Sequence, residues 1–453
     1  MTPKTTRVLI VGGGYVGMFT ALRLQRRLRG LLRHGELKIT VVDPQSYMTY
    51  QPFLPEAAAG NLEPRHVVAP LRRVLHRATI LNGRVVKIDH ANRRATVRLV
   101  ADELAGDRPV ADGAREVSYD LLVMAAGSIS RTLPIPGLAE HGIGFKTVGE
   151  AIYLRNHVLG QLDIAESTMD ERLRRRALTF VFVGGGFAGV EALAELEDMA
   201  RDACRYYPSI DVGDMRWMLV EASGRILPEV GTDMGRWTVE ALRKRGIEVR
   251  LETLLKSAEN GRIVLSTGDR FEAGTLVWTA GVKANPVAAA TDLPLDDAGR
   301  IKATAELTVE GVPQAFAAGD NAAVPDITRP GSWCAPNAQH AVRQAKRLAG
   351  NIIADLRGQP MKPYRHRYAG SVASLGLHQG VAQIYGVKVR GVVAWLLHRT
   401  YHLSRMPTLN RKVRVVADWT LALFFHREVV SLGELQSPRE EFELAAGRRG
   451  PDE

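Results

Sequence analysis

Short apolar runs that end in polar or glycine-rich turns dominate the hydropathy pattern of this chain. The runs at residues 8–11 and 180–183 are rich in Val, Ile and Phe and predict buried parallel strands, and each leads directly into a cluster of glycines. A second apolar run follows each cluster, at residues 38–42 and 217–220. The pattern predicts an α/β chain with two Rossmann-like dinucleotide-binding domains.

The two glycine clusters repeat one nucleotide-binding phrase. The first copy holds Gly12, Gly13, Gly14, Val16 and Gly17, and the second holds Gly184, Gly186 and Gly189. Glycines in such a turn let backbone N–H groups at the start of a helix approach a pyrophosphate. In both copies an acid ends the next strand, Asp43 or Glu221, where it can accept hydrogen bonds from ribose hydroxyls. Two copies imply two dinucleotides; the alternative is a pair of glycine turns in doubly wound sheets that bind nothing.

Later strands indicate how the two halves are joined. The runs at residues 119–127 and 275–281 follow their own glycine clusters at similar distances, so we expect one dinucleotide domain to be inserted within the other. A polar, alternating stretch at residues 84–117 predicts a small antiparallel hairpin or meander. A strand at residues 315–320 should return to the first domain and bring Asp320 to its cofactor, although a helix N-cap is the alternative for this residue.

The domain boundaries expected from these patterns divide the chain into four segments. The first domain should comprise residues 1–145 and 286–385, the inserted domain residues 146–285, and a C-terminal amphipathic segment residues 386–453.

The C-terminal segment combines helical apolar spacing with basic residues. Two helices are expected, at residues 391–405 and after the break at Pro407, neither long enough to span a bilayer. Basic and histidine side chains rim them: His398, Arg399, Arg405, Arg411, Lys412 and Arg414. This pattern suits insertion in the plane of one leaflet of an anionic membrane, and the alternative is a hairpin packed on its own domain or on a dimer partner.

Composition narrows the remaining possibilities. The chain has 453 residues, 45% of them hydrophobic, and a formal net charge of +11, for which nucleic acid, anionic lipid and solvated helix faces are competing explanations. Cys204 and Cys334 form neither a CxxC pair nor a metal-ligand set, so no metal is expected. The first apolar run is too short for a signal peptide, which predicts a cytosolic location.

A series of further phrases runs in order along nearly the whole chain. They lie at residues 50–60, 126–128, 135–137, 183–191, 220–222, 278–282, 318–320 and 338–341. Together they resemble the glutathione-reductase type of flavoprotein and, within it, the type II NADH dehydrogenases, which are single-subunit NADH:quinone oxidoreductases. The resemblance implies a quinone as partner, no nucleic acid, and docking through the C-terminal helices on the cytoplasmic face of the membrane.

The resemblance also assigns the cofactors. It places FAD at the first glycine turn, with Asp43 on the adenosine ribose and Asp320 on the ribityl chain, and NADH at the second turn. Glu221 favours NADH because a 2′-phosphate would face its carboxylate, although Arg225 could swing toward a phosphate. Further cofactor-binding positions implied are Gln51, Ala126, Gly127, Gly281 and Gly319.

Glu191 and Gln339 are the candidate catalytic residues. Glu191 lies in the first turns of the helix that follows the second glycine turn, where a carboxyl group in an apolar cleft could relay protons; the alternative is a glutamate that only favours the helix start. Gln339 fits the family segment AQxAxQ. Arg343 replaces the second glutamine of that segment, and Gln344 stands one residue late, which would turn it about 100° away.

Two further positions depart from the family pattern. Ala188 stands where many relatives have threonine, and residues 377–379 read Leu-His-Gln without the usual basic residue, so the acceptor, menaquinone or ubiquinone, is open. We expect a peripheral, non-proton-pumping NADH:quinone oxidoreductase that passes hydride from NADH to FAD and two electrons to a quinone, with a homodimer as the default assembly. The rivals are a soluble NAD(P)H:acceptor flavin reductase and a non-enzymatic NADH-sensing flavoprotein.

Overall fold

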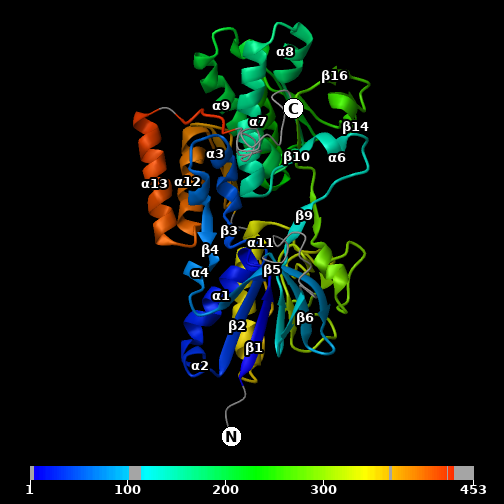
Figure 1. Cartoon of the computed structure of the whole chain (residues 1–453), viewed down its shortest axis with the longest axis vertical. Coiled ribbons are helices and arrows are strands. Elements are labelled where there is room, and N and C mark those ends of the chain that lie inside the picture. Colours follow the sequence, from blue (N-terminus) through cyan, green and yellow to red (C-terminus); the bar gives the residue numbers. More distant parts are fainter. Residues whose placement is uncertain (1–4, 101–113, 367–369, 426, 433–453) are drawn as a thin grey trace, which may run out of the picture. The chain divides into compact units, whose positions relative to one another are not determined.

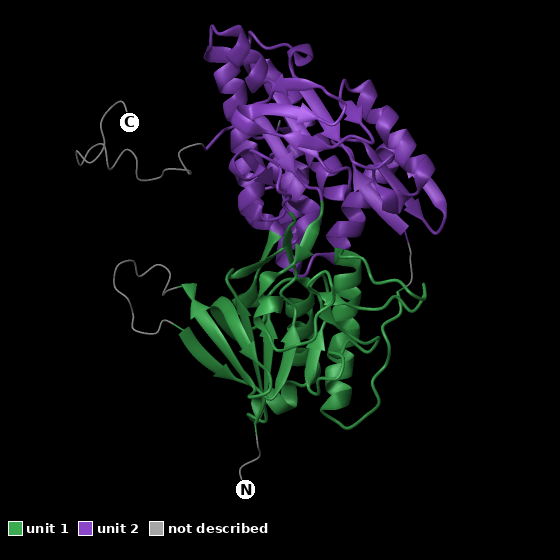
Figure 2. Ribbon diagram, turned by 90° about the vertical axis from the view of Figure 1, so that its right-hand side faces the viewer, with its two compact units in different colours: residues 1–49, 68–131, 281–368 green, residues 50–67, 132–280, 369–453 purple. Residues whose placement is uncertain are grey.

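The computed structural model describes residues 5–100, 114–366, 370–425 and 427–432. The chain divides into two compact units, coloured separately in Figure 2. Unit 1 comprises Met1–Thr49, Val68–Arg131 and Gly281–Tyr368, and unit 2 comprises Tyr50–Val67, Thr132–Ala280 and Ala369–Glu453. The predicted insertion of one α/β domain within another is confirmed.

Unit 1 is built on a seven-stranded sheet of order β20-β8-β1-β2-β5-β6-β7. Its strands are β1 (Thr6–Val11), β2 (Leu37–Asp43), β5 (Thr79–Asp89), β6 (Arg94–Leu99), β7 (Ala114–Ser118), β8 (Leu121–Met124) and β20 (Ala315–Ala317). Pairing is parallel from β20 to β5 and antiparallel from β5 to β7, which confirms both the predicted meander and the returning strand. Helix α1 (Tyr15–Arg27), which follows β1, packs against α11 (Ala338–Asp355) (Figure 1).

Smaller elements complete unit 1. They are α2 (Arg29–Arg33), β3 (Tyr47–Thr49), β4 (Val68–Pro70), α4 (Leu71–Val74), β9 (Ser128–Ser130), β18 (Val282–Ala284), β19 (Ile301–Lys302) and β21 (Ala322–Ala323).

Unit 2 is built on a five-stranded parallel sheet of order β10-β17-β11-β12-β13. The strands are β10 (Gly142–Gly144), β17 (Thr275–Trp278), β11 (Thr179–Val183), β12 (Arg216–Val220) and β13 (Glu248–Arg250). A second sheet of β14 (Leu255–Ser257), β15 (Arg262–Leu265) and β16 (Arg270–Glu272) shares one apolar core with β11, β12 and β17. The helices of this part are α6 (Leu138–His141), α7 (Val148–Ser167), α8 (Glu171–Ala177), α9 (Phe187–Ala203) and α10 (Thr232–Lys244).

The C-terminal part of unit 2 consists of a three-stranded antiparallel sheet and two helices. Strands β22 (Gly370–Ser374), β23 (Gly380–Ile384) and β24 (Val387–Arg390) pack against α12 (Gly391–Arg405), and α13 (Leu409–Phe424) lies beside α12 (Figure 1). Both helices were expected from the sequence. In the parts of the chain that the structure describes, no helix combines the length and apolarity needed to cross a membrane.

The compact units differ from the expected boundaries at four places. Residues 132–145, expected in the first domain, belong to unit 2, and residues 281–285, expected in the inserted domain, belong to unit 1. Residues 50–67, expected in the first domain, belong to unit 2 because α3 (Leu54–Ala58) packs against α7 and α9. The segment 369–385 also belongs to unit 2, because β22 and β23 pack against α9 and α12. The segments 50–67 and 369–385 both pack against helices distant from them in the chain, so the local sequence pattern does not show that they belong to unit 2.

Candidate functional site

The first glycine turn connects β1 to α1 in unit 1. Gly12 has φ +102°, and a Cβ at this position would collide with the backbone of Ala125 on the neighbouring strand segment. A Cβ at Gly17 would likewise collide with the carbonyl oxygen of Gly12, so α1 can pack this closely only with glycine there. A Cβ at Gly14 would meet open space, which leaves the start of α1 accessible to an anion.

Asp43 closes this turn at the carboxyl end of β2. The backbone N–H of Gly13 donates to its Oδ2 at 2.6 Å, and the N–H of Gln45 donates to its Oδ1 at 2.7 Å. Burial raises the pKa of Asp43, and these two amides act in the opposite direction. The carboxylate is therefore fixed beside the turn, with lone pairs left to accept a hydroxyl.

The second glycine turn, between β11 and α9 in unit 2, repeats this geometry. Gly184 has φ +115°, and a Cβ at Gly189 would collide with the carbonyl oxygen of Gly184. The N–H of Gly185 donates to Glu221 Oε2 at 2.6 Å, and the N–H of Ser223 donates to its Oε1 at 2.7 Å. The two units thus contain the same turn, closed by an acid in the same way.

Several predicted residues of unit 1 lie together at the carboxyl ends of β8, which neighbours β1, and of β20, which neighbours β8. Ser128 Oγ donates to Asp320 Oδ2 at 2.6 Å, and the N–H of Gly127 donates to Asn321 Oδ1 at 3.2 Å. The Ala126 carbonyl accepts from Asn285 Nδ2 at 3.3 Å. Asp320, Ala126 and Gly127 therefore gather near the first turn. Asn285 and Asn321 were not identified from the sequence, because each contacts this group through its side-chain amide and belongs to no recognisable motif.

The contact of Gln344 differs from the sequence expectation. Its side chain is buried and its Oε1 accepts from the N–H of Gly319 at 2.7 Å, so it reaches the segment that carries Asp320 rather than turning away from the site. Gly319 also faces α1, where an added Cβ would meet the side chain of Val16.

Helix α11 begins with the remaining family segment. Asn337 caps the helix by accepting from the N–H of His340, and Gln339 is half-buried in the first turn. Arg343 Nη1 lies 3.0 Å from His366 Nδ1, and His340 Nδ1 lies 3.0 Å from the Tyr364 hydroxyl. The residue that replaces the family glutamine is thus engaged with a histidine.

Two other predicted cofactor-binding residues, Gln51 and Gly281, are distant in sequence from the residues described above. Gln51 belongs to unit 2, where its Nε2 donates to the Lys146 carbonyl at 3.2 Å. Gly281 has φ +98°, and its carbonyl accepts from the N–H of Arg131 at 3.1 Å.

Glu191 lies one turn into α9 and is 6% exposed. Its Oε1 accepts from the N–H of Ser374 at 2.9 Å and lies 3.2 Å from Nε2 of His398 on α12. His398 was assigned by sequence to the rim of the docking helices, together with Arg399. The structure corrects both assignments, since the two side chains point inward and are buried.

Helices α12 and α13 attach to unit 2 through polar contacts. Arg399 Nη2 and Trp419 Nε1 both donate to Glu56 Oε2 at 2.8 Å, and His66 Nδ1 lies 2.6 Å from Asp418 Oδ2. Ala394, Trp395 and Val415 are buried, whereas ten other apolar side chains are exposed: Val392, Val393, Leu396, Leu409, Val413, Val416, Leu421, Leu423, Phe424 and, just after α13, Phe425. We call these ten residues the apolar docking face. Arg405, Arg411, Lys412 and Arg414 lie on the same two helices.

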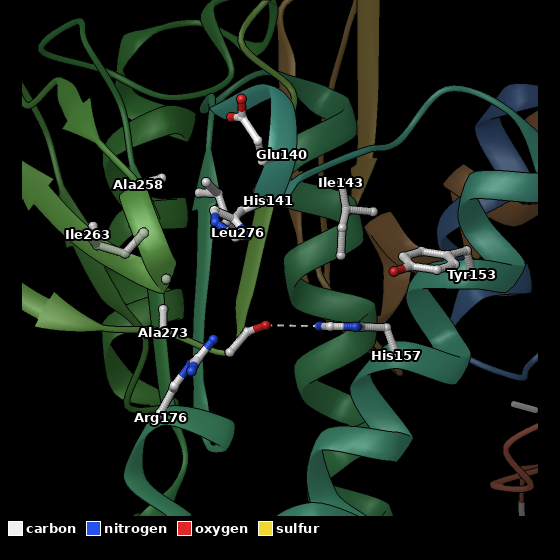
Figure 3. Close-up of a pocket in the computed structure, with 12 residues that line it drawn as sticks. Glu140, His141, Ile143, Tyr153, His157, Arg176, Ala258, Ile263, Ala273 and Leu276 are labelled. Carbon is white, nitrogen blue, oxygen red and sulfur yellow. Dashed lines mark hydrogen bonds between the residues drawn. The ribbon is translucent and has the colours of Figure 1, made fainter. Parts of the chain in front are cut away.

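Unit 2 also contains a pocket, whose lining residues are drawn in Figure 3. It holds about 170 Å³ and is lined by residues that include Tyr153, His157, Arg176 and Leu276. His157 Nε2 lies 3.1 Å from the Gly274 carbonyl, at the start of β17, whereas the glycine turn follows the end of the parallel strand β11. The pocket is therefore at the opposite edge of the sheet from the predicted dinucleotide.

Comparison with known proteins agrees with this geometry. The sequence model of the family described as "Pyridine nucleotide-disulphide oxidoreductase" matches residues 6–345. The chain is 29% identical to "Type II NADH:quinone oxidoreductase Ndh" of Mycobacterium tuberculosis, over 94% of this chain and 89% of that protein. It is 28% identical to "Demethylphylloquinone reductase NdbB" of Synechocystis, over 92% and 96%. Among solved structures, NDH2 from Plasmodium falciparum in complex with NADH superposes with a TM-score of 0.84 at 16% identity, covering 94% of this chain and all of that one.

Proposed function

The chain belongs to the pyridine nucleotide-disulphide oxidoreductase family, and from this premise we propose that it is an FAD-dependent NADH:quinone oxidoreductase. Relatives that align over nearly the whole chain bear the names of NADH:quinone and demethylphylloquinone reductases. The observation that carries the proposal is the repeated turn, since each unit has a glycine-rich helix start closed by a carboxylate. Two such turns suit one bound and one visiting dinucleotide.

The residues of unit 1 fit FAD. Open space at Gly14 leaves room for a pyrophosphate at the start of α1, Asp43 would accept the adenosine ribose, and Asp320 the ribityl chain. Gly127 and Gly319 would let the backbone approach the flavin closely. FAD, when bound, supplies the redox chemistry, taking hydride from NADH and giving two electrons to the acceptor.

The residues of unit 2 fit NADH. A Cβ at Gly186 would meet open space, so the start of α9 can receive a pyrophosphate. Glu221, already held by two backbone amides, would accept the ribose hydroxyls and repel a 2′-phosphate. This arrangement favours NADH over NADPH, and Arg225 is exposed to solvent.

Glu191 and Gln339 are proposed as the groups that serve the acceptor. Quinone reduction consumes protons, and Glu191 is a buried carboxyl group close to the second glycine turn. The chain has only two cysteines, Cys204 and Cys334, which are far apart in sequence and free. A redox-active cysteine pair is therefore not available, and an acceptor reached directly from the flavin fits better.

The apolar docking face supports a membrane location for the proposed reaction. Leu409, Leu423 and Phe424 are each more than 70% exposed, an arrangement that water disfavours and a lipid surface stabilises. The basic residues of α12 and α13 would bind anionic headgroups, which are concentrated on the cytoplasmic leaflet. We assign the face to lipid, and a homodimer is the assembly we expect there.

An anaerobic stopped-flow experiment tests the proposal. Purified protein should contain FAD, NADH should bleach its 450 nm band within one turnover, and a short-chain quinone should restore the band. Bleaching without restoration by quinone, but with restoration by a soluble dye, would instead indicate a soluble NAD(P)H:acceptor reductase. Reduction too slow for turnover would indicate an NADH sensor, and protein that stays colourless after reconstitution with FAD would refute all three.

A further inference from the structure

A group of buried charged side chains lies between α12 and the rest of unit 2. It consists of Glu56 on α3, Glu191 and Glu195 on α9, Ser374 on β22, and His398 and Arg399 on α12, which we call the α12 carboxylate cluster. Every member is 8% exposed or less. The cluster includes the proposed catalytic residue Glu191, but its other members have no role in the function proposed above.

Ser374 joins the two glutamates of α9. Its N–H donates to Glu191 Oε1 at 2.9 Å, and its hydroxyl donates to Glu195 Oε1 at 2.7 Å. Glu195 Oε2 also accepts from Asn61 Nδ2 at 3.1 Å. His398 approaches Glu191 from the other side at 3.2 Å, so a continuous row of polar groups runs from α12 through Glu191 and Ser374 to Glu195.

The charges of this cluster do not balance unless it retains a proton. Arg399 already pairs with Glu56 at 2.8 Å, which leaves Glu191 and Glu195 with His398 as their near cation. Burial disfavours two unneutralised carboxylates at such a distance. One proton is therefore held on Glu195 or on Glu191, in addition to the proton that makes His398 cationic.

The pKa directions agree with this charge count. Burial acts to lower the pKa of His398, but the close approach of Glu191 and the charges of Glu191, Glu56 and Glu195 outweigh it, so that this pKa lies above its usual value. Burial, together with the charges of Glu56 and Asp198, raises the pKa of Glu195 to about 7.

Three other charged or titratable groups face the cluster. Asp198 and Arg427 act on Glu195 in opposite directions, and Ser374 favours its ionised form. His402, one turn beyond His398 on α12, lies with its ring centroid 4.6 Å from that of His398. Burial and the nearby His398 charge lower the pKa of His402, which stays neutral and holds no proton for release.

We propose that His398 is a positioning residue of the quinone-reducing step, which acts through Glu191 by keeping one proton on the buried Glu191–His398 pair until the acceptor is reduced. This inference rests on the proposed function. Reduction of a quinone to a quinol takes two electrons and two protons; NADH supplies both electrons and one proton as hydride, and the pair supplies the second proton. The proton that the pair gives up is replaced from solvent.

The test compares His398→Gln with His402→Gln, two substitutions of the same kind one turn apart on α12. Holoenzyme reduced by one equivalent of NADH is mixed anaerobically with a short-chain quinone from pH 6 to pH 9, and reappearance of the 450 nm band is recorded. In His398→Gln the alkaline fall in rate should move to lower pH by about one unit or more, giving a roughly tenfold slower rate at pH 8. Flavin reduction by NADH should not change in either variant, and His402→Gln should keep the wild-type pH profile.

A spectroscopic measurement follows the proton itself. In protein labelled with ¹⁵N-histidine, the His398 signal should titrate with a midpoint above pH 6.5. The signal is assigned from its loss in His398→Gln or, if that variant does not fold, by elimination with variants of the other histidines. Glu191→Gln should lower that midpoint by about one unit or more. A midpoint below 6.5, or a wild-type pH profile in His398→Gln, would overturn the inference. Failure of quinone to reoxidise wild-type protein would instead refute the proposed function, which separates the two.

Discussion

Replacing Leu423 and Phe424 by serine should detach the protein from anionic vesicles without unfolding it. The two side chains are 74% and 78% exposed, at the end of α13, and Val415 is the buried residue of that helix. Complete transfer of Leu or Phe out of water gains about 1.5–3 kcal/mol each. Scaled by the exposed fractions, the pair contributes about 2–5 kcal/mol, which corresponds to a loss of partitioning on the order of 100-fold or more.

The assay is co-sedimentation with vesicles that contain phosphatidylglycerol, at low and high salt. The matched control is Met169→Ser, because Met169 is 97% exposed in unit 2 but lies outside the apolar docking face. The control should bind like the wild type, and both variants should keep their FAD and the rate of NADH-dependent dye reduction. Binding of the double variant within threefold of the wild type would refute the assignment of this face to lipid.

Deleting the C-terminal segment after residue 385 would be a poorer experiment. Arg399 would be lost, and the carboxylate of Glu56, 1% exposed, would be left buried without its cation. Removing one partner of a buried ion pair costs about 3–5 kcal/mol, so the truncation should destabilise unit 2 as well as remove the apolar docking face, and the two effects could not be separated.

Three further predictions concern the two units separately. Gly189→Ala places a methyl group against the Gly184 carbonyl and should raise KM for NADH more than about tenfold while FAD stays bound. Steady-state kinetics would measure KM and the flavin spectrum would show the bound FAD; an unchanged KM would contradict the close packing. Glu221→Ala removes the carboxylate that faces a 2′-phosphate, and the ratio of kcat/KM for NADPH to that for NADH should rise about tenfold, with no rise expected if another group selects NADH. Burial lowers the pKa values of His340 and His366 to about 4, below the usual 6.5 of the unfolded chain, so unfolding takes up protons and stability should fall as pH drops from 6.5 toward 4. Thermal scans at pH 7 and pH 5 would measure this, and His366→Asn should weaken the dependence.

The sequence was sufficient to predict those parts of the site that depend on a short, continuous motif. Both glycine turns with their acids, Asp43 and Glu221, could be predicted because the turn, the helix start and the strand end lie within one short βαβ unit. The returning strand at residues 315–317 was predictable for a similar reason, since a short apolar run that ends in glycine is itself typical of a buried parallel strand.

Contacts between distant segments could not be predicted. Residue spacing on the helix predicted that Gln344 would point away from the site. Its side chain is nevertheless long enough to reach the Gly319 amide, and spacing alone does not include side-chain length. His398 and Arg399 read as surface charge because basic residues near an apolar helix usually face water. Their acidic partners, Glu191 and Glu56, lie more than 200 positions earlier, and no local pattern joins them.

The chain does not end at α13 but returns along unit 2. Arg427 Nη2 pairs with Asp198 Oδ2 at 2.7 Å, Arg155 Nη2 donates to the Glu428 carbonyl at 2.8 Å, and Leu432 exchanges hydrogen bonds with the Asn156 side chain. The two amphipathic helices therefore form a loop anchored at both ends, not a hinged arm. A force on either helix is transmitted directly to α7 and α9, so we expect the two helices to move with the rest of unit 2 as one piece rather than to swing aside.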